Sequence, residues 1–394
     1  ARQPRLARQP RLARQPRLVL TQRVKRRVFY LHSPLGDIGH AVHLLRLLAE
    51  LKRARGSRSL IFLRAPSSYP YSLFKKYGKV IRLPAAPSKA SGRRLAALLS
   101  GFRPSSLITE FFPFGRTECL PEIGPVLAAA EACGAKLFAS VPMPYFTATE
   151  TGVKALLGTC ARYGKILVHG PEGADLPYMA KAVSLERRIS PPAFLSVFRE
   201  LRRKIVFTGY LVPGKPAHKM VRKENFVLVT RGGGSTSDRF FEAAIRAASL
   251  SGLPFKLVAG PSTPPRRLAY FRRLAASGGG KAEVLGSSTA MPELMAKAAV
   301  CVSTAGGSVY EMLALRKKMV LAPFCGARGR EHSDQLARAW LMRDLAGAGL
   351  LLPADLTPGK IAAAVRERLG KPLKISKRVK PSWFLGAEKA ARLL

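Results

Sequence analysis

Three short segments combine glycine with hydroxyl or charged side chains in a way that suits phosphate binding. They cover residues 33–40 (SPLGDIGH), 231–236 (RGGGST) and 303–308 (STAGGS). Glycine permits positive φ and lets a ligand approach the backbone closely, and a helix that follows such a turn offers free N–H groups and the positive end of its dipole. The segments therefore predict sites for a diphosphate, because a diphosphate leaving group gains negative charge as its bond breaks.

These turns do not match the commonest nucleotide-binding motifs. None fits the P-loop pattern G-x-x-x-x-G-K-[ST]. None is a clean G-x-G-x-x-G with a suitable acid about twenty residues later, which disfavours a hydride-transfer enzyme. The third turn instead leads to Glu311, three residues into the next helix. Its carboxylate can accept both hydroxyls of a ribose, and the simpler alternative is a first-turn glutamate stabilised by the helix dipole.

Candidates for a catalytic base lie in the first half of the chain. His40 exchanges a proton near neutral pH, Glu110 follows a predicted strand, and Asp37 shares a turn with His40. Each has a structural alternative, since His40 can position its loop and Glu110 can order Arg116. The sequence leaves these candidates open, because a base needs suitable geometry first. The remaining histidines have no partner pattern and are expected to be structural or surface residues: His32, His43, His169 and His218.

Short apolar runs alternate with helical patterns along the whole chain. In residues 39–55, for example, Val42, Leu45 and Leu48 recur at helical spacing. The fold class is therefore α/β, with parallel sheets covered by helices on both faces. Ligands bind beyond the carboxyl ends of such strands, where the three turns lie. Strands are predicted at residues 28–32, 60–63, 80–83, 107–109, 136–140 and 166–168, and in the second half at 226–230, 255–259, 282–285, 300–303 and 319–322.

The chain is very basic. Its 67 Lys and Arg residues and 23 acidic residues give a net charge of +44, which favours polyanionic partners or reflects a generally basic proteome. Because ARQPRL occurs three times in residues 1–18 and cannot build a core, residues 1–27 are predicted to be a disordered basic arm. Without the ten cations of this arm the chain still carries +34. A non-enzymatic polyanion-binding protein is one alternative, but no zinc-finger or RNP-like motif predicts nucleic acid as the partner.

Composition also bears on location. The five cysteines, which form no C-x-x-C pair, predict reduced thiols, a cytoplasmic protein and no structural metal site. No apolar run of 18 residues predicts a membrane span. Residues 69–77 mix aromatic residues with lysines, which fits either peripheral association with an anionic membrane or a helix that buries Tyr71 and Phe74.

Residues 303–315 (STAGGSVYEMLAL), 320–323 (VLAP) and 331–335 (EHSDQ) resemble the C-terminal domain of nucleotide-sugar glycosyltransferases. They are most similar to the family 28 enzymes that add N-acetylglucosamine to form lipid II. Residues 36–40, 109–116 and 207–210 look like the acceptor half of related predicted glycosyltransferases. The resemblance implies the GT-B fold, with two Rossmann-like domains facing across a cleft. It places an acceptor domain at 28–208, a donor domain at 209–370, and a basic tail with a terminal helix at 371–394.

The resemblance further implies an inverting transfer of a hexose or N-acetylhexosamine from a nucleotide diphosphate, with UDP as the expected nucleotide. The first turn departs from the usual Gly-Gly-Thr-Gly-Gly-His, so the acceptor stays unknown. Epimerases and hydrolases of sugar nucleotides share this fold and are the alternative. Arg231 and two helix N-termini would replace a metal, so neither a divalent ion nor a cofactor is expected.

The implied donor site gathers residues from several loops. Residues 286–291 lie where the nucleobase is usually held by backbone groups. The donor-binding side chains and turns carried over to this sequence are Arg231, Gly233, Gly234 and Ser235 in the opening turn, Ser303, Gly306, Gly307 and Ser308 at the diphosphate, Glu311 at the ribose, and His332 and Gln335 at the sugar.

Overall fold

The first half of the chain builds a parallel sheet of seven strands in the order β3-β2-β1-β4-β5-β6-β7. The computed structural model describes residues 25–33, 38–53, 57–66, 69, 71–186, 188–213, 224–233, 237–323 and 333–394. The middle strands are buried on both faces, which explains their nearly unbroken apolar sequences. The strands are β1 (Lys25–His32), β2 (Ser57–Arg64), β3 (Lys79–Arg82), β4 (Ser106–Glu110), β5 (Lys136–Val141), β6 (Lys165–Val168) and β7 (Ile205–Phe207).

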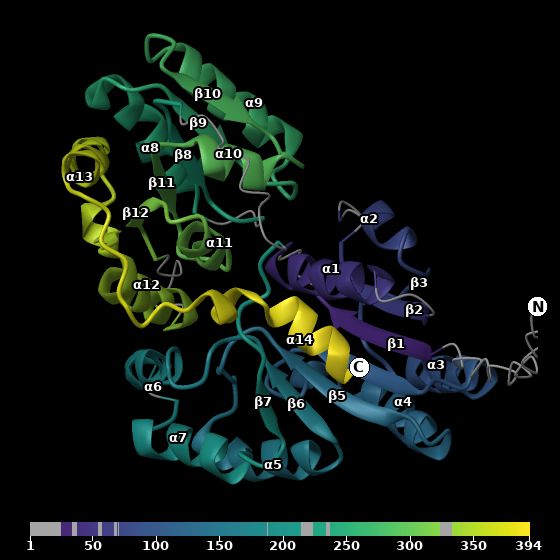
Figure 1. Cartoon of the computed structure of the whole chain (residues 1–394). Helices are drawn as coiled ribbons and strands as arrows, with labels where there is room; N and C mark the ends of the chain where they lie inside the picture. The colour runs from purple at the N-terminus through teal and green to yellow at the C-terminus, as the bar shows by residue number, and fades with distance from the viewer. Residues whose placement is uncertain are drawn as a thin grey trace, which may run out of the picture.

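The second half builds a parallel sheet of six strands in the order β10-β9-β8-β11-β12-β13. Each sheet has its own core and forms its own lobe (Figure 1). We call these the N-terminal and C-terminal lobes. The strands are β8 (Val227–Thr230), β9 (Phe255–Val258), β10 (Ala282–Leu285), β11 (Val300–Ser303), β12 (Lys318–Leu321) and β13 (Gly349–Leu350).

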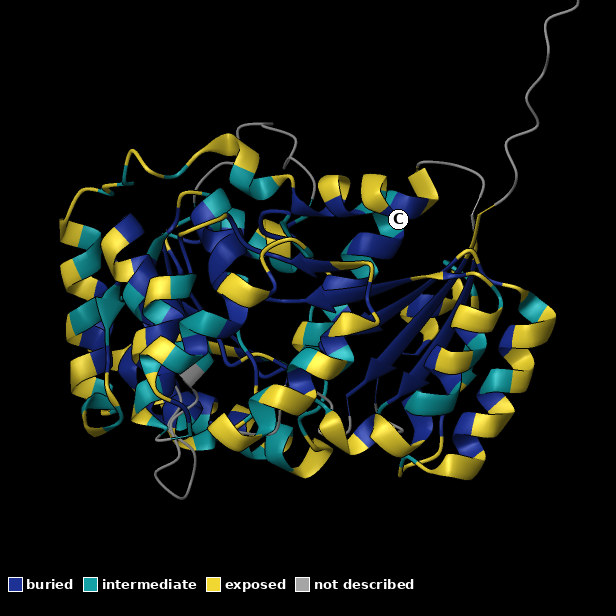
Figure 2. Cartoon of the chain, turned by 90° about the horizontal axis from the view of Figure 1, so that it is seen from below, coloured by how far each residue is buried: buried dark blue, intermediate teal, exposed yellow. Residues whose placement is uncertain are grey.

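Helices flank both sheets, with buried faces toward the strands and exposed faces outward (Figure 2). In the N-terminal lobe they are α1 (Ile38–Arg53), α2 (Ser72–Lys75), α3 (Lys89–Phe102), α4 (Leu120–Ala132), α5 (Val153–Ala161), α6 (Leu176–Leu185) and α7 (Pro191–Glu200). After β8 they are α8 (Asp238–Ser251), α9 (Pro265–Ala276), α10 (Met291–Lys297), α11 (Ser308–Ala314), α12 (Ser333–Ala346), α13 (Pro358–Gly370) and α14 (Gly386–Leu393).

The predicted α/β architecture is confirmed, and every predicted strand is present with ends shifted by at most three residues. Two strands are not apparent in the sequence, because β7 and β13 are only three and two residues long. The basic arm is shorter than predicted. Lys25, Arg26 and Arg27 pair with residues 57–59 as the start of β1, and residues 1–24 lie outside the described residues.

The C-terminal segment returns to the N-terminal lobe. Helix α14 packs against α1 (Figure 1), and the Arg27 side chain donates to the Leu394 carbonyl at 3.2 Å. The predicted terminal helix is α14, and a 3₁₀ turn, η4 (Pro381–Phe384), precedes it. Helix α14 therefore belongs structurally to the N-terminal lobe, whereas Ile375 and Val379 before it pack on the core of the C-terminal lobe.

Two stretches of chain cross between the lobes and touch each other. We call residues 208–212 and 381–386 the double crossing. The Tyr210 N–H donates to the Trp383 carbonyl at 2.6 Å, and the Gly386 N–H donates to the Tyr210 carbonyl at 3.3 Å. A Cβ on Gly386 would lie 2.1 Å from the Gly209 carbonyl oxygen, and Gly209 itself has φ +89°. Only glycine allows both backbones to approach this closely.

The aromatic and basic segment at residues 69–77 forms part of the core. Tyr69, Tyr71 and Phe74 are buried, and the Arg82 guanidinium lies over the Tyr71 ring at 4.0 Å from its centroid. The second interpretation, a helix that buries Tyr71 and Phe74, is therefore the one the structure shows. Among the described residues no helix combines the length and apolar character needed to cross a membrane.

Candidate functional site

The three glycine turns follow β1, β8 and β11, which lie where the strand order of each sheet reverses. In the N-terminal lobe the chain turns from β1 to β2 on one side and returns to β4 on the other. In the C-terminal lobe β8 and β11 are the corresponding pair. The carboxyl ends of such neighbouring strands form a crevice, because their connections leave on opposite sides. The turns after β1, β8 and β11 are thus in the positions where a ligand is expected.

His40 and Glu110, two of the predicted catalytic residues, lie together in the N-terminal crevice. Glu110 ends β4, His40 begins α1 after the neighbouring β1, and His40 Nδ1 lies 3.3 Å from Glu110 Oε1. The His40 side chain is 20% exposed and that of Glu110 is 2% exposed. When Nδ1 donates to the carboxylate, Nε2 is left as the proton acceptor, as in a histidine base oriented by an acid. Asp37, the third candidate, lies outside the described residues.

A chain of polar side chains behind Glu110 holds it in place. The Ser140 hydroxyl donates to the Glu110 carboxylate at 2.5 Å, and Ser140 Oγ lies 3.0 Å from His169 Nε2. His169 Nδ1 in turn lies 2.9 Å from the Thr208 hydroxyl. Burial lowers the pKa of His169 to about 3, so this ring is neutral. Since Ser140 donates to Glu110, it accepts from His169, and the chain orients the carboxylate toward His40.

Glu311 points out of the C-terminal lobe toward α1. Its carboxylate is paired with the Arg46 guanidinium, and these side chains are 11% and 12% exposed. Arg46 also donates to the Leu211 carbonyl in the double crossing. A glutamate that only stabilised its own helix would not need a partner from the opposite lobe. The carboxylate lies one helical turn from residues 306–308, and in this structure its partner is Arg46.

The turn at residues 303–308, which was expected to bind the diphosphate, is tightly held. Ala305 has φ +58°, a left-handed conformation unusual for a residue with a side chain. Its carbonyl accepts from the buried Arg338 guanidinium at 2.7 Å, and a second nitrogen of Arg338 lies 3.2 Å from Met143 Sδ in the N-terminal lobe. The turn that carries Gly306, Gly307 and Ser308 is therefore fixed by contacts on both lobes.

Arg231, which was expected to stabilise the diphosphate, turns its side chain into the C-terminal lobe. Its buried guanidinium donates to the Ala259 carbonyl and the Thr263 hydroxyl at 2.8 Å each, and it pairs with Asp238. Those contacts use the side chain to fasten the turn after β8 to the loop after β9. The physical reason is that Arg231 lies over the rings of Phe241 and Phe271 inside the lobe.

The other predicted donor residues are distributed as follows. Gly233 packs so closely on α1 that a Cβ would lie 2.0 Å from Ile38 Cγ2. Gln335 is on the first turn of α12, and residues 286–291 connect β10 to α10. Ser303 is the last residue of β11 and is buried. Gly234, Ser235 and His332 lie outside the described residues.

A carboxylate joins the lobes beside the donor turn. Asp175, before α6, accepts from the Tyr210 hydroxyl and from the Tyr310 hydroxyl of α11 at 2.9 Å each. The two tyrosine rings stack with centroids 3.9 Å apart. Burial raises the pKa of Asp175 from 3.8 to about 6, against the opposing effect of the two tyrosine hydrogen bonds.

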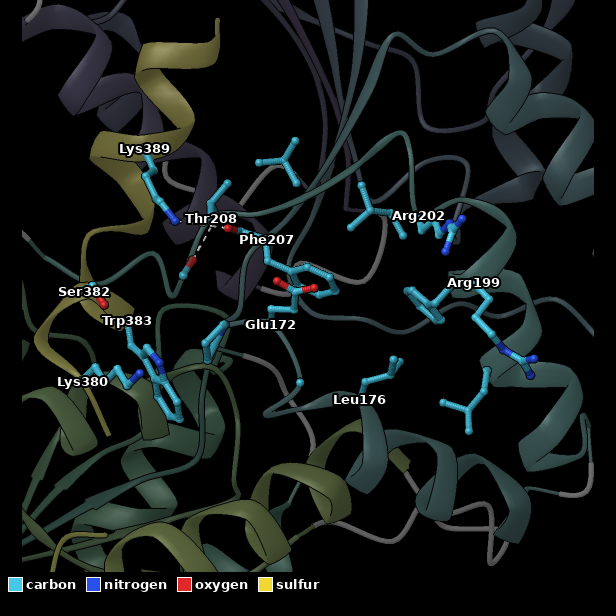
Figure 3. Close-up of a pocket in the computed structure, with 17 residues that line it drawn as sticks. Glu172, Leu176, Arg199, Arg202, Phe207, Thr208, Lys380, Ser382, Trp383 and Lys389 are labelled. Carbon is cyan, nitrogen blue, oxygen red and sulfur yellow. Dashed lines mark hydrogen bonds between the residues drawn. The ribbon is translucent and has the colours of Figure 1, made fainter. Parts of the chain in front are cut away.

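A separate hollow of about 910 Å³ lies at the outer edge of the N-terminal lobe, beside β7. Figure 3 shows apolar side chains such as Phe207 and Trp383 alongside the cationic ends of Arg199, Arg202 and Lys389. None of the predicted catalytic or donor-binding residues lines it. It is therefore distinct from the site between the lobes.

A protein-family model, curated relatives and solved structures all agree with the two-lobe fold described above. Residues 226–393 match the glycosyltransferase family 28 C-terminal domain. This part of the chain is therefore similar to a family 28 domain. The same residues include α14, so this domain match extends over the tail that was expected to be separate.

Curated relatives align with a little under two thirds of the chain. The chain is 28% identical over 268 residues to the UDP-N-acetylglucosamine--N-acetylmuramyl-(pentapeptide) pyrophosphoryl-undecaprenol N-acetylglucosamine transferase of Brucella canis, which covers 64% of this chain and 65% of that protein. The transferase of the same description from Rhizobium leguminosarum is 28% identical over 267 residues, which covers 65% of this chain and 67% of that protein. The match thus spans a little under two thirds of the length of the Brucella relative.

Solved structures share the whole architecture. MurG of Acinetobacter baumannii superposes with a TM-score of 0.58 at 14% identity, over 93% of this chain and 98% of that chain. The UDP-GlcNAc 2-epimerase of Methanocaldococcus jannaschii superposes with a TM-score of 0.56 at 11% identity, over 94% and 99%. The expected GT-B fold is confirmed.

Several residues at the site were not singled out from the sequence. Arg46, Ser140 and Asp175 were not considered, and His43 and His169 were expected to be structural. One signal was available for α1, because His43 falls among the buried residues of an otherwise apolar face. The partners of the other residues lie on distant strands, and the sequence gives no register for them.

Proposed function

We propose that this chain is an inverting glycosyltransferase that moves a sugar from a nucleotide diphosphate donor, a UDP-linked hexose or N-acetylhexosamine, to an acceptor hydroxyl. One observation carries the proposal: helix α1 holds His40 beside Glu110 and, six residues later, holds Arg46 against the ribose candidate Glu311. Six helical residues span about 9 Å. The sugar and diphosphate of a donor can bridge that separation.

The proposed reaction is a single displacement. His40 Nε2 takes the proton of the acceptor hydroxyl as its oxygen bonds to the anomeric carbon, and the bond from that carbon to the diphosphate breaks. Glu110 stabilises the imidazolium that forms. The N–H groups of the turn at residues 306–308 receive the growing charge of the diphosphate. Attack opposite to the leaving group inverts the anomeric centre.

We also propose that the reaction needs no divalent ion, since backbone N–H groups can stabilise the leaving diphosphate. The test is activity in EDTA. Full activity supports the proposal, and a loss that magnesium restores contradicts it.

Epimerisation is the second candidate, because the chain superposes on the epimerase almost as well as on MurG. A transferase consumes nucleotide sugar only when an acceptor is present, whereas an epimerase needs no acceptor. Consumption of UDP-N-acetylglucosamine by the chain alone, with formation of its epimer, would favour the second candidate.

The donor site is tested by ligand-induced thermal stabilisation. A ligand at a hundred times its Kd stabilises the native state by about 2.7 kcal/mol, so UDP and UDP-sugars should raise the Tm of the wild-type chain. UDP should bind more tightly than 2′-deoxy-UDP, because Glu311 accepts from the ribose hydroxyls.

Glu311→Ala and Glu311→Gln should weaken UDP by about tenfold or more, the usual effect of losing a charge-assisted hydrogen bond, and should remove the preference for ribose. Glu293→Ala, on the exposed side of α10, is the matched control and should behave as wild type. If neither UDP nor any UDP-sugar shifts the Tm of the wild-type chain, the proposed donor site is rejected.

A further inference from the structure

Helix α1 of the N-terminal lobe lies directly against both nucleotide turns of the C-terminal lobe. Ile38 contacts Gly233 in the turn after β8, where a Cβ would approach to 2.0 Å, and His43 Nε2 lies 3.4 Å from the Cβ position of Gly307. One turn further on, Arg46 pairs with Glu311. The two polar side chains of this contact, His43 and Arg46, therefore face the turn assigned to the diphosphate and the carboxylate assigned to the ribose.

Among the described residues the His43 ring makes an edge contact with the His169 ring, with centroids 6.4 Å apart, but its Nδ1 has no hydrogen-bond partner. His43 is 7% exposed. Buried polar atoms are almost always paired, and a lost pairing is unfavourable. A structural histidine in this position would be expected to have a carbonyl or hydroxyl beside it, as His169 has Thr208 at 2.9 Å.

The electrostatic surroundings of His43 suit an anion. Burial, followed by Arg46, His169, His40 and Arg338, lowers the pKa of His43 well below 6.5. Arg46 and Arg338 are the permanent cations among these groups, and they are paired with the carboxylates of Glu311 and Asp334. A diphosphate beside Gly307 can take over the pairing with Arg46, and its negative charge raises the pKa of a nearby imidazole.

We propose that His43 and Arg46 bind the donor diphosphate from the N-terminal lobe, and that Arg46 leaves Glu311 for the diphosphate when the ribose arrives. The inference rests on the proposed donor site and adds ligands to it. It also assigns to His43 and Arg46 the positive charge that was expected from Arg231, whose side chain is held inside the C-terminal lobe. Because the charged ligands come from both lobes, the diphosphate itself joins them.

The inference predicts that binding of the diphosphate is coupled to protonation of His43. Neutral His43 in the free chain becomes imidazolium when the diphosphate binds, so binding takes up a proton. Affinity for a UDP-sugar is then highest at acidic pH and falls as the pH rises through the pKa of His43 in the complex. The diphosphate of a UDP-sugar is a diester, so it does not titrate between pH 5.5 and 8.5 and does not confound this measurement.

The experiment is calorimetry with UDP-N-acetylglucosamine and, as a probe without phosphate, uridine, from pH 5.5 to 8.5 and in buffers of different ionisation enthalpy. The wild-type chain should take up a proton with the UDP-sugar and none with uridine. His43→Gln should bind the UDP-sugar about tenfold more weakly at pH 6, as expected for a lost charge-assisted hydrogen bond, with no proton uptake and unchanged affinity for uridine.

The Arg46→Gln variant distinguishes two roles for Arg46. It is either a ligand of the diphosphate or a residue that only competes with the ribose for Glu311. A diphosphate ligand predicts weaker binding of the UDP-sugar, whereas a competitor predicts tighter binding of both probes. Arg53→Gln, on the exposed end of the same helix, is the control for loss of one positive charge. Equal affinity and proton uptake in wild type and His43→Gln would overturn the inference while leaving the donor site intact. If neither probe binds any variant, the proposed function itself fails.

Discussion

At the residue scale, the contact between His40 and Glu110 changes their status from rival bases to partners. The sequence alone assigns the same role to each of them. In the structure Glu110 is the buried member and is held by Ser140, while His40 keeps one ring nitrogen for a substrate. We therefore propose His40 as the proton acceptor and Glu110 as the residue that orients it.

This assignment predicts unequal and non-additive losses of activity. His40→Ala should lower kcat by about 10²- to 10⁴-fold, the usual contribution of a general base, with little change in UDP affinity. Glu110→Gln should lower kcat less, and the double variant should resemble His40→Ala because residues that act as a unit are not additive. The measurement is initial rates with a UDP-sugar and an acceptor once one is found.

The control for that series is Glu118→Gln, since Glu118 is half exposed and pairs with His32 rather than His40. It should retain wild-type kcat. The assignment would be wrong if Glu110→Gln were as inactive as the double variant while His40→Ala kept substantial activity.

The sequence could predict that residues following the strands gather at one site, because parallel strands bring their carboxyl ends to one edge of the sheet. His40, Glu110 and Glu311 were found in this way. The direction of a long side chain could not be predicted. Arg231 turns inward because an aromatic pair and Asp238 receive it, and Arg46 meets Glu311 only because the lobes close on each other, a contact between positions 265 residues apart.

At the element scale, the junction of Asp175 with Tyr210 and Tyr310 predicts a stability that depends on pH. Asp175 has an ordinary pKa of 3.8 and a native pKa of about 6. The stability that this group contributes is therefore fully present below pH 3.8 and is lost as the pH rises through 6. A shift of this size corresponds to about 3 kcal/mol.

Asp175→Asn removes this titration. Relative to wild type, its free energy of unfolding should rise between pH 5 and pH 7.5, measured by urea denaturation. Asp355→Asn is the control, because hydrogen bonds from Lys360 and the Leu352 N–H lower the pKa of the exposed Asp355, which is therefore ionised at both values. A constant difference between Asp175→Asn and wild type across this range would contradict the native pKa of Asp175.

Elements were predicted well where they are long and regular. Apolar runs between glycine turns located the strands of both sheets, because strands buried on both faces must be apolar. The starts of β1 and β2 were missed by three residues because their first residues are polar, and only pairing with a neighbour makes them strand.

At the scale of the whole molecule, the positive charge is spread beyond the N-terminal arm. Residues 1–24 contain seven of the 67 cations, so their removal leaves most of the charge in place. Because Lys25 already belongs to β1, a truncation should end at residue 24 rather than 27.

We therefore predict that peripheral binding to an anionic membrane survives this truncation. The full chain and the chain from residue 25 should both sediment with anionic vesicles at low salt and be released by salt, because the Debye length falls from about 10 Å at 0.1 M to 3 Å at 1 M. Neutral vesicles are the control. If neither form sediments with anionic vesicles at low salt, the membrane proposal is rejected.

The double crossing has a consequence for a chain that is made as two separate fragments. A break between Val212 and β8 would leave the C-terminal fragment with α14, which packs on α1 of the other fragment. That fragment would carry its own docking peptide, and its partner would present α1 and Gly209 as the receptor. Two separately made halves would therefore recognise each other through contacts that are intramolecular in the single chain, and fragment complementation is built into the fold.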